Sequence, residues 1–241
     1  MRQGDVVRRQ DTKHRSSTRF LAEGLEGLAV ALGVLVTWPV SKRWLDNWGS
    51  LPEEQRRSWP GDGLVLPEHT TSTRAVTIDA PASVVWRWLV QFGLGRGGFY
   101  SYELLERLVG IPVRNVESIV REHQHLAVGD EVLLHPKAPG IPVASLESER
   151  HICFGVADDS RRPTEKPDPA RSWSMYVEPR SENSSRLLLR SCIEPLRDRR
   201  FSKRLAASIE APIDFVMEQR MLRTIKRLAE YGHGPTGAPA S

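Results

Sequence analysis

Two strand-like stretches followed by one long helical pattern, near the C-terminus, decide the fold. The strands are SWSMYVEP at 172–179 and SRLLLRSCI at 185–193, and the helical pattern includes APIDFVMEQRMLRTIKRLAE at 211–230. Neighbouring strands joined by a short turn, with no helix between them, are typical of an antiparallel sheet. Apolar residues recur every three or four positions from about Ser202 to Tyr231, which predicts an amphipathic helix. Pro212 lies inside this pattern and is expected to kink or divide the helix.

Further strands precede this segment. EVLLHP at 131–136, PVASLES at 142–148 and HICFGVA at 151–157 are short β-favouring runs bounded by turn residues. The charged, proline-rich stretch at 158–170 predicts a mobile loop between two of these strands. The middle of the chain is therefore expected to contribute most of one antiparallel sheet.

The compact domain is predicted to span 73–231. It begins with the β-favouring run TRAVTIDA at 73–80, and Pro81 then suits the first turn of a helix. Val85, Trp88 and Phe92 recur at helical spacing on one face of that helix. Glycines at positions 93, 95, 97 and 98 end it and permit a tight backbone path.

The glycine-rich stretch QFGLGRGGFYSY at 91–102 is the most distinctive in the chain. A dinucleotide-binding loop is excluded, because such a loop follows a strand and opens a helix, whereas here a helix precedes the glycines. Gln91, Arg96, Tyr100 and Tyr102 carry polar tips that suit the mouth of a ligand cavity. The alternative is that Tyr102 is a core anchor and that Arg96 is solvated or paired with a carboxylate.

The N-terminal region is predicted to combine a basic, disordered arm at 1–19 with an apolar segment. Residues 1–19 contain six basic and two acidic side chains, and this +4 equals the formal net charge of the whole chain. The remaining chain is neutral, so a nucleic-acid partner is not expected. Residues 20–40 form an apolar helix long enough to span a bilayer, although Glu23 and Glu26 oppose that interpretation. A helix packed on the domain and a cleaved signal peptide remain as alternatives.

Two further segments complete the predicted organisation. Residues 41–72 are expected to be a connector that wraps the domain, since they are rich in proline, glycine and charge. Residues 232–241 have the composition of a disordered tail. The predicted location is membrane-associated or cytoplasmic, with a single N-terminal membrane helix as one form of the association.

The stretches DAPASVVWRWLVQFG at 79–93 and GRGGFYSYELLERLVG at 95–110, with the late strands and helix, resemble SRPBCC proteins of the actinobacterial type. This superfamily includes START domains and polyketide cyclases. The resemblance covers roughly Trp44 to Tyr231. It implies an α+β helix-grip fold, in which a curved antiparallel sheet wraps around a long C-terminal helix and encloses an apolar cavity. It places these residues in the walls or entrance of that cavity: Trp88, Gln91, Arg96, Tyr100, Tyr102, Ile213, Val216, Met217 and Met221.

The sequence contains no recognisable catalytic motif. His123, His125 and His135, with Glu103 and Glu147, are the candidates for acid–base work, and a His-x-His pair lacks a third ligand at metal-site spacing. No metal and no cofactor are therefore predicted. Cys153 and Cys192 are expected to be buried thiols.

Three functional hypotheses follow. The leading one is the binding or transfer of a hydrophobic, lipid-like or polyketide-like molecule in an internal cavity. The second is a cyclase or aromatase in which Arg96, Tyr100 or Tyr102 polarises a carbonyl group. The third is a membrane-tethered interaction protein whose cavity is filled by its own side chains. The expected partners are a hydrophobic small molecule and, through the N-terminal segment, a membrane.

Overall fold

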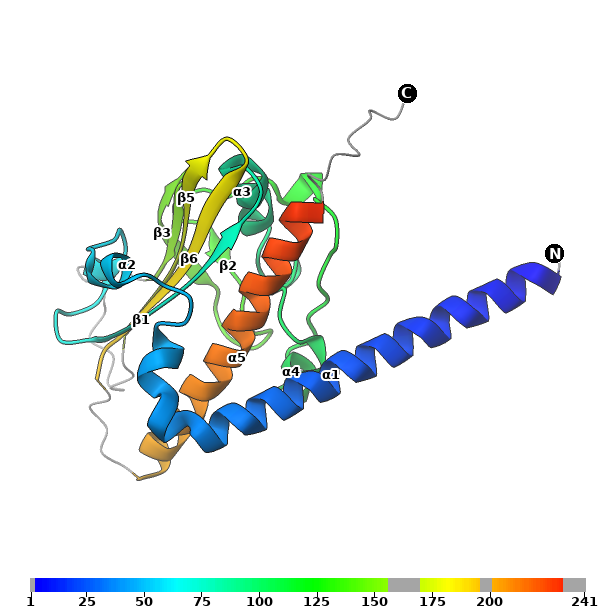
Figure 1. Ribbon diagram of the computed structural model, residues 1–241, viewed down its shortest axis with the longest axis horizontal. Coiled ribbons are helices and arrows are strands. Elements are labelled where there is room, and N and C mark those ends of the chain that lie inside the picture. The colour runs from blue at the N-terminus through cyan, green and yellow to red at the C-terminus, as the bar shows by residue number, and fades with distance from the viewer. Residues whose placement is uncertain (1–2, 156–169, 196–200, 232–241) are drawn as a thin grey trace.

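The computed structural model describes residues 3–155, 170–195 and 201–231 (Figure 1). Six strands form one antiparallel sheet in the order β1-β6-β5-β4-β3-β2. The bounds are β1 Thr70–Ile78, β2 Glu131–Val132, β3 Ile141–Glu147, β4 His151–Phe154, β5 Arg171–Ser181 and β6 Ser184–Ile193. The predicted loop at 158–170, except Ala170, and the predicted tail lie outside the described residues.

The helices are α1 Gln3–Asp46, α2 Pro52–Arg56, α3 Ala82–Val90, α4 Glu103–Leu108 and α5 Phe201–Tyr231, with short 3-10 turns η1 Asp62–Leu64 and η2 Arg121–His123. Helix α5 crosses one face of the sheet, and α1 crosses α5 in turn (Figure 1). This arrangement is a helix-grip fold of the α+β class. Helix α5 continues through Pro212, which the sequence predicted to kink or divide it. One missing N–H removes only one of the hydrogen bonds along so long a helix.

The main core lies between the α5 side of the sheet, α3 and α5. Alternation along β6 turns Leu187 and Leu189 toward α5, where both are almost fully buried. Leu89 of α3 and Leu222 and Ile225 of α5 close this core. The α5 side of the sheet is called the concave face below, and the opposite side the convex face.

The convex face is covered by the connector. Glu54 of α2 forms a buried ion pair with Arg186 of β6, with Nε to Oε1 at 2.8 Å, and Asp62 of η1 pairs with Arg190 at 2.7 Å. Trp59 stacks at a tilt on Tyr176, with ring centroids 4.5 Å apart. These contacts hold the segment between α1 and β1 firmly on the sheet.

Helix α1 extends beyond the predicted 20–40 helix at both ends, through most of the predicted arm and into the connector. Its inner face carries Gly24 and Gly27, which let the backbone approach α4 closely. A Cβ atom at Gly27 would lie 2.8 Å from the Tyr102 ring, and one at Gly24 would collide with Leu104. Trp38 and Leu45 then pack against Phe215 and Val216 of α5.

The two glutamates of the apolar segment both find polar partners on the domain. Glu23 lies 3.6 Å from the Arg220 guanidinium, and the Tyr102 hydroxyl donates to Glu26 at 3.4 Å. Carboxylates inside an apolar helix are thus compensated while α1 is packed on the domain.

Candidate functional site

A cavity of about 620 Å³ lies between the concave face of the sheet, α5, α4 and α1. Most of its wall is apolar. Phe92, Phe99 and the β-strand residues Phe154 and Trp173 supply an aromatic side, with Phe154 and Trp173 stacked 5.6 Å apart between centroids. Ligand pockets of small apolar molecules commonly have this size and composition.

Helix α1 forms part of the cavity wall. Leu28, Ala31, Leu32 and Leu35 contribute from one side, and Leu105, Leu108 and Val109 contribute from α4 and the turn after it, across the opening. The N-terminal segment therefore bounds the site directly, a role that its apolar composition alone did not reveal.

The predicted α5 residues fall in or beside this cavity. Ile213, Val216, Met217 and Met221 all line it, since residues three or four apart lie on the same side of a helix. Their role toward a ligand remains a proposal.

The residues predicted from the glycine-rich stretch lie elsewhere, in a network that fixes a neighbouring loop. The Arg96 guanidinium donates to the carbonyls of Val90 and His123, each at 2.9 Å, and of His125 at 3.2 Å. Burial lowers the pKa of Arg96, against the opposing charge of Asp130. Arg96 is thus engaged with backbone carbonyls and does not line the cavity.

Gln91 and Tyr100 belong to the same network. Gln91 is fully buried and donates from Nε2 to the Tyr100 hydroxyl at 2.8 Å, while its Oε1 accepts from the Val120 N–H at 3.0 Å. The Tyr100 hydroxyl donates onward to the carbonyl of Trp88 at 3.3 Å. Tyr100 has φ +57°, and its N–H donates to Asn115 at 2.7 Å, which stabilises this left-handed conformation.

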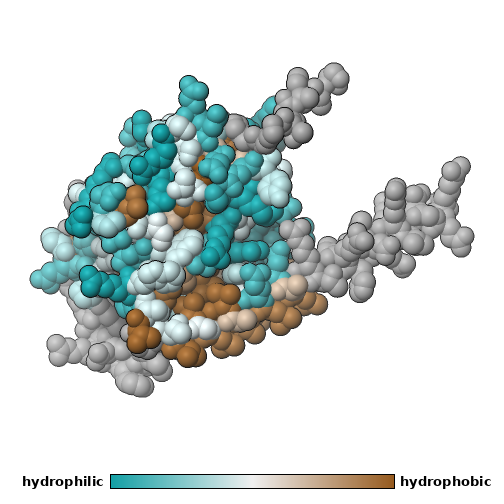
Figure 2. All heavy atoms as spheres, viewed as in Figure 1, coloured by the Kyte–Doolittle hydropathy of each residue, from teal (hydrophilic) through white to brown (hydrophobic). Residues whose placement is uncertain are grey.

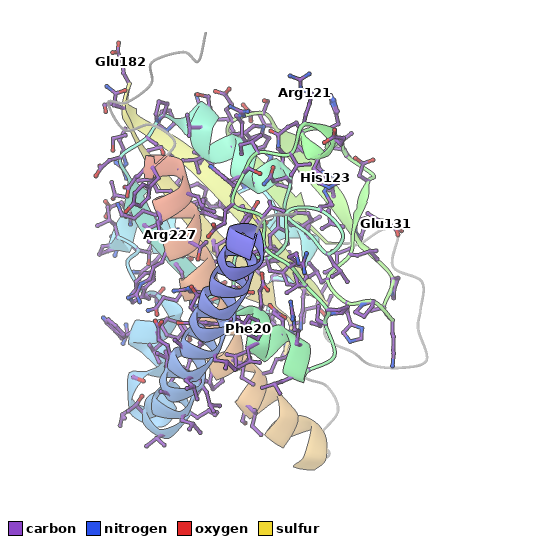
Figure 3. All side chains as sticks on the ribbon, turned by 90° about the vertical axis from the view of Figure 1, so that its right-hand side faces the viewer. Phe20, Arg121, His123, Glu131, Glu182 and Arg227 are labelled. Carbon is purple, nitrogen blue, oxygen red and sulfur yellow. The ribbon has the colours of Figure 1, made fainter. Side chains whose placement is uncertain are left out.

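Tyr100 and Tyr102 instead border a second, more polar groove of about 500 Å³ between α1, α4 and α5. Figure 3 labels Phe20 and Arg227, which also line it. Arg227 lies 3.5 Å from Glu117, and Arg220 packs over the Tyr102 ring at 4.8 Å. The cationic side chains of this groove therefore have partners within the protein.

The polar part of the main cavity was not anticipated from the sequence. Asp214 and Glu218 of α5 line it, together with Glu106 of α4 and Ser101. Their signal in the sequence was the four-residue spacing of Glu210, Asp214 and Glu218, which places three carboxylates along one side of α5.

Two carboxyls of the cavity, the half-buried Asp214 and the buried Glu106, have perturbed acidities. Burial raises the pKa of Asp214 to about 7; the charges of Glu218 and Glu210 raise it further, while Arg171 and Arg74 lower it. Groups with such shifts inside a cavity are candidates for functional contacts.

Glu106 is affected in the same direction. Burial raises its pKa, although the Ser101 hydroxyl, which donates to it at 2.7 Å, opposes the shift. Across the described residues, no group of three or more side chains is arranged to hold a metal ion. Cys153 and Cys192 are buried free thiols on the convex side of the sheet.

Comparison with known proteins gives similarities of fold. No protein-family model matches the sequence, and a search of curated proteins finds no match. Among solved structures, the chain is similar to the ZhuI aromatase/cyclase from Streptomyces sp. R1128, at 15% identity and a TM-score of 0.41, over 71% of this chain and 99% of that one.

A polyketide cyclase-like protein from Corynebacterium glutamicum is similar at 16% identity and a TM-score of 0.37, over 73% of this chain and 100% of that one. The Aha1 protein from Colwellia psychrerythraea is similar at 11% identity and a TM-score of 0.36, over 68% of this chain and 99% of that one. The structural neighbours include aromatase/cyclase and polyketide cyclase-like proteins, the class that the sequence resembles.

Proposed function

We propose that this protein binds a hydrophobic small molecule in the concave-face cavity, as a binding or transfer module. The observation that carries the proposal is the cavity itself: about 620 Å³ of open volume, walled mainly by aliphatic and aromatic side chains. Filling such a space with apolar atoms is favourable, since it restores the dispersion contacts that a void lacks. An open volume of this size also speaks against the hypothesis of a cavity filled by its own side chains.

The cyclase hypothesis that uses Arg96, Tyr100 or Tyr102 gains no support from this geometry. None of the three lines the main cavity. The Nη2 of Arg96 donates to backbone carbonyls, and the Tyr100 hydroxyl is engaged with Gln91 and the Trp88 carbonyl. Binding without assigned chemistry is therefore the function that the site supports best.

The same proposal includes contact with a membrane through the outer face of α1. Figure 2 shows apolar side chains gathered along this helix. The exposed members succeed one another every three or four residues and so share one side of the helix. They are Leu21, Leu25, Leu28, Leu32, Val36, Val40 and Trp44, called the outer stripe here.

The outer stripe adjoins the opening of the cavity. Leu28 and Leu32 belong to both, and Leu108 and Val109 beside α4 are also exposed at the cavity rim. By length and composition Phe20–Trp38 is able to cross a bilayer. Because its inner face is fitted to α4 and α5, we infer that α1 lies on the membrane surface while packed, with the cavity opening toward lipid.

A titration with Nile red, a neutral apolar fluorophore, tests the binding function. The full chain is expected to bind it with a blue-shifted emission. The double variant Ile213→Trp/Met217→Trp places two indoles in the cavity and should weaken binding at least about ten-fold, because bulky groups occupy the ligand space. Equal affinity of the wild type and this variant would contradict the cavity as the binding site.

Sedimentation with vesicles tests the membrane contact separately. The triple variant Leu25→Ser/Val36→Ser/Val40→Ser alters the outer stripe without touching the cavity wall. It should lose binding to phosphatidylcholine vesicles containing phosphatidylglycerol, since each exposed aliphatic side chain contributes roughly 1 kcal/mol or more when buried in lipid. The matched control Val128→Ser, at an exposed site outside α1 and α4, should bind as the wild type does. Unchanged sedimentation of the triple variant would exclude the outer stripe as the membrane contact.

A further inference from the structure

Three carboxylates follow one another along α5 at Glu210, Asp214 and Glu218, each one helical turn apart. Residues four apart lie on the same side of a helix, so their charges repel one another. Such a row is stable only where neighbouring groups compensate it.

The two outer carboxylates are compensated by arginines from the sheet. Arg171 of β5 forms a bidentate pair with Glu210, at 2.5 and 2.8 Å. Arg74 of β1 pairs with Glu218, whose other oxygen accepts from the Trp173 indole N–H at 2.9 Å and from Ser191 at 3.3 Å. Both outer positions are therefore satisfied within the protein.

Asp214, between them, has no hydrogen-bond or ion-pair partner among the described residues, and it lines the cavity. Ile213, Met217 and Glu218 of the same helix line the cavity with it, as do Arg171, Ser172 and Ser191 from the sheet. Asp214 is half-buried, so its carboxyl has lost part of its water without gaining a donor from the protein. A ligand in the cavity can supply that donor.

Resting on the proposed ligand-binding function, we propose that the ligand is an apolar molecule whose polar head donates a hydrogen bond to Asp214. Its head is a hydroxyl or a protonated amine and not a carboxylate. A carboxylate head would meet like charges from the row on α5 and from Glu106 of α4, and Arg171, which also lines the cavity, is already paired with Glu210. The rest of the molecule occupies the aromatic and aliphatic part of the cavity.

Displacement of Nile red from the full chain by four ten-carbon probes tests this assignment. The probes are 1-decanol, decylamine, decanoate and decane, which share a chain and differ in the head group. Decanol or decylamine should displace the dye at a concentration at least about five-fold lower than decane, the increment of one net hydrogen bond. Decanoate should be the weakest of the polar probes.

Substitutions separate the head-group contact from general binding. Asp214→Leu should abolish the advantage of the donor probes while leaving displacement by decane unchanged. The matched control Glu210→Gln, one turn earlier and outside the cavity wall, should preserve that advantage. If decanol and decylamine both keep their advantage in Asp214→Leu, or if decanoate binds best to the wild type, the head-group assignment is overturned.

The two levels of the proposal fail in different ways. If the wild type binds no Nile red, the ligand-binding function itself is contradicted. If the dye binds and decane displaces it as well as the donor probes do, only the assignment to Asp214 is contradicted. The advantage of decanol alone over decane would identify a neutral hydroxyl head, and that of decylamine alone a cationic one.

Discussion

The two faces of the sheet differ in how completely their charged side chains are paired. On the convex face, Arg186 and Arg190 are each paired with a connector carboxylate. Their Nη1 atoms donate to the hydroxyls of Thr77 and Thr73, respectively. On the concave face Glu210 and Glu218 are paired with arginines, whereas Asp214 lines an open cavity and has no hydrogen-bond or ion-pair partner among the described residues. Full pairing is typical of a structural role, whereas an unpaired group beside an open volume indicates a place for a ligand.

The largest effect on stability is expected on the convex face, from Arg186→Met. It leaves the buried Glu54 carboxylate without its main partner, and removal of one member of a buried pair costs about 3–5 kcal/mol. Urea denaturation should show this loss. Arg57→Met, which breaks the exposed pair between the connector and Glu178 of β5, is the control and should cost less than about 1 kcal/mol. Similar losses of stability in both variants would contradict the structural role assigned to the buried pair of Arg186 and Glu54.

The acidity of Asp214 predicts how stability depends on pH. The folded protein keeps this proton up to about pH 7, whereas the unfolded chain releases it near the usual pKa of 3.8. The folded state thus binds more protons between these values, and the contribution of Asp214 to stability, complete below pH 3.8, is lost as the pH rises through about 7.

Asp214→Asn should remove this part of the pH dependence and stabilise the protein at pH 8 relative to the wild type, on the order of 2 kcal/mol. The groups facing Asp214 are Glu210 and Glu218 on α5, Arg171 and Arg74 on the sheet, and Glu106 across the cavity. Thermal denaturation at pH 5 and pH 8 measures the effect. A variant that is destabilised equally at both pH values would show that Asp214 is structurally paired.

A smaller effect is expected in the glycine-rich bend. Tyr100→Phe removes a hydroxyl that accepts from Gln91 and donates to the Trp88 carbonyl, so it should cost about 1 kcal/mol of stability. Nile red affinity should not change, because Tyr100 does not line the main cavity. Loss of dye binding without loss of stability would show that the glycine-rich bend contributes to the ligand site.

The sequence predicted the antiparallel strands and the long helix because the decisive patterns are local, whereas the helix-grip arrangement was implied by the family resemblance. The alternation in β5 and β6 and the apolar spacing of α5 lie in continuous stretches, and the two strands pair through a short turn. The cavity face of α5 was implied by the family resemblance. Ile213 and Met217 do line the cavity in the structure, and their contact with a ligand stays a prediction.

The glycine-rich bend shows that a local pattern does not reveal which distant groups its side chains contact. Arg96 and Gln91 have polar tips suited to a ligand, yet their partners are backbone groups of the loop around 118–125, about thirty residues away in sequence. Conversely, Asp214 is one carboxylate among three at regular spacing. Its lack of an arginine depends on where Arg74 and Arg171 lie in the sheet, and the sequence of α5 does not encode that.

The most direct test of the central proposal is native mass spectrometry of the full chain, released from its expression host in a mild detergent. We expect the wild type to carry an additional non-covalent mass that organic extraction recovers as an apolar compound. Ile213→Trp/Met217→Trp should lack that mass. A wild type found only at its own mass, unchanged after exposure to Nile red and the ten-carbon probes, would contradict a ligand-binding cavity on the concave face.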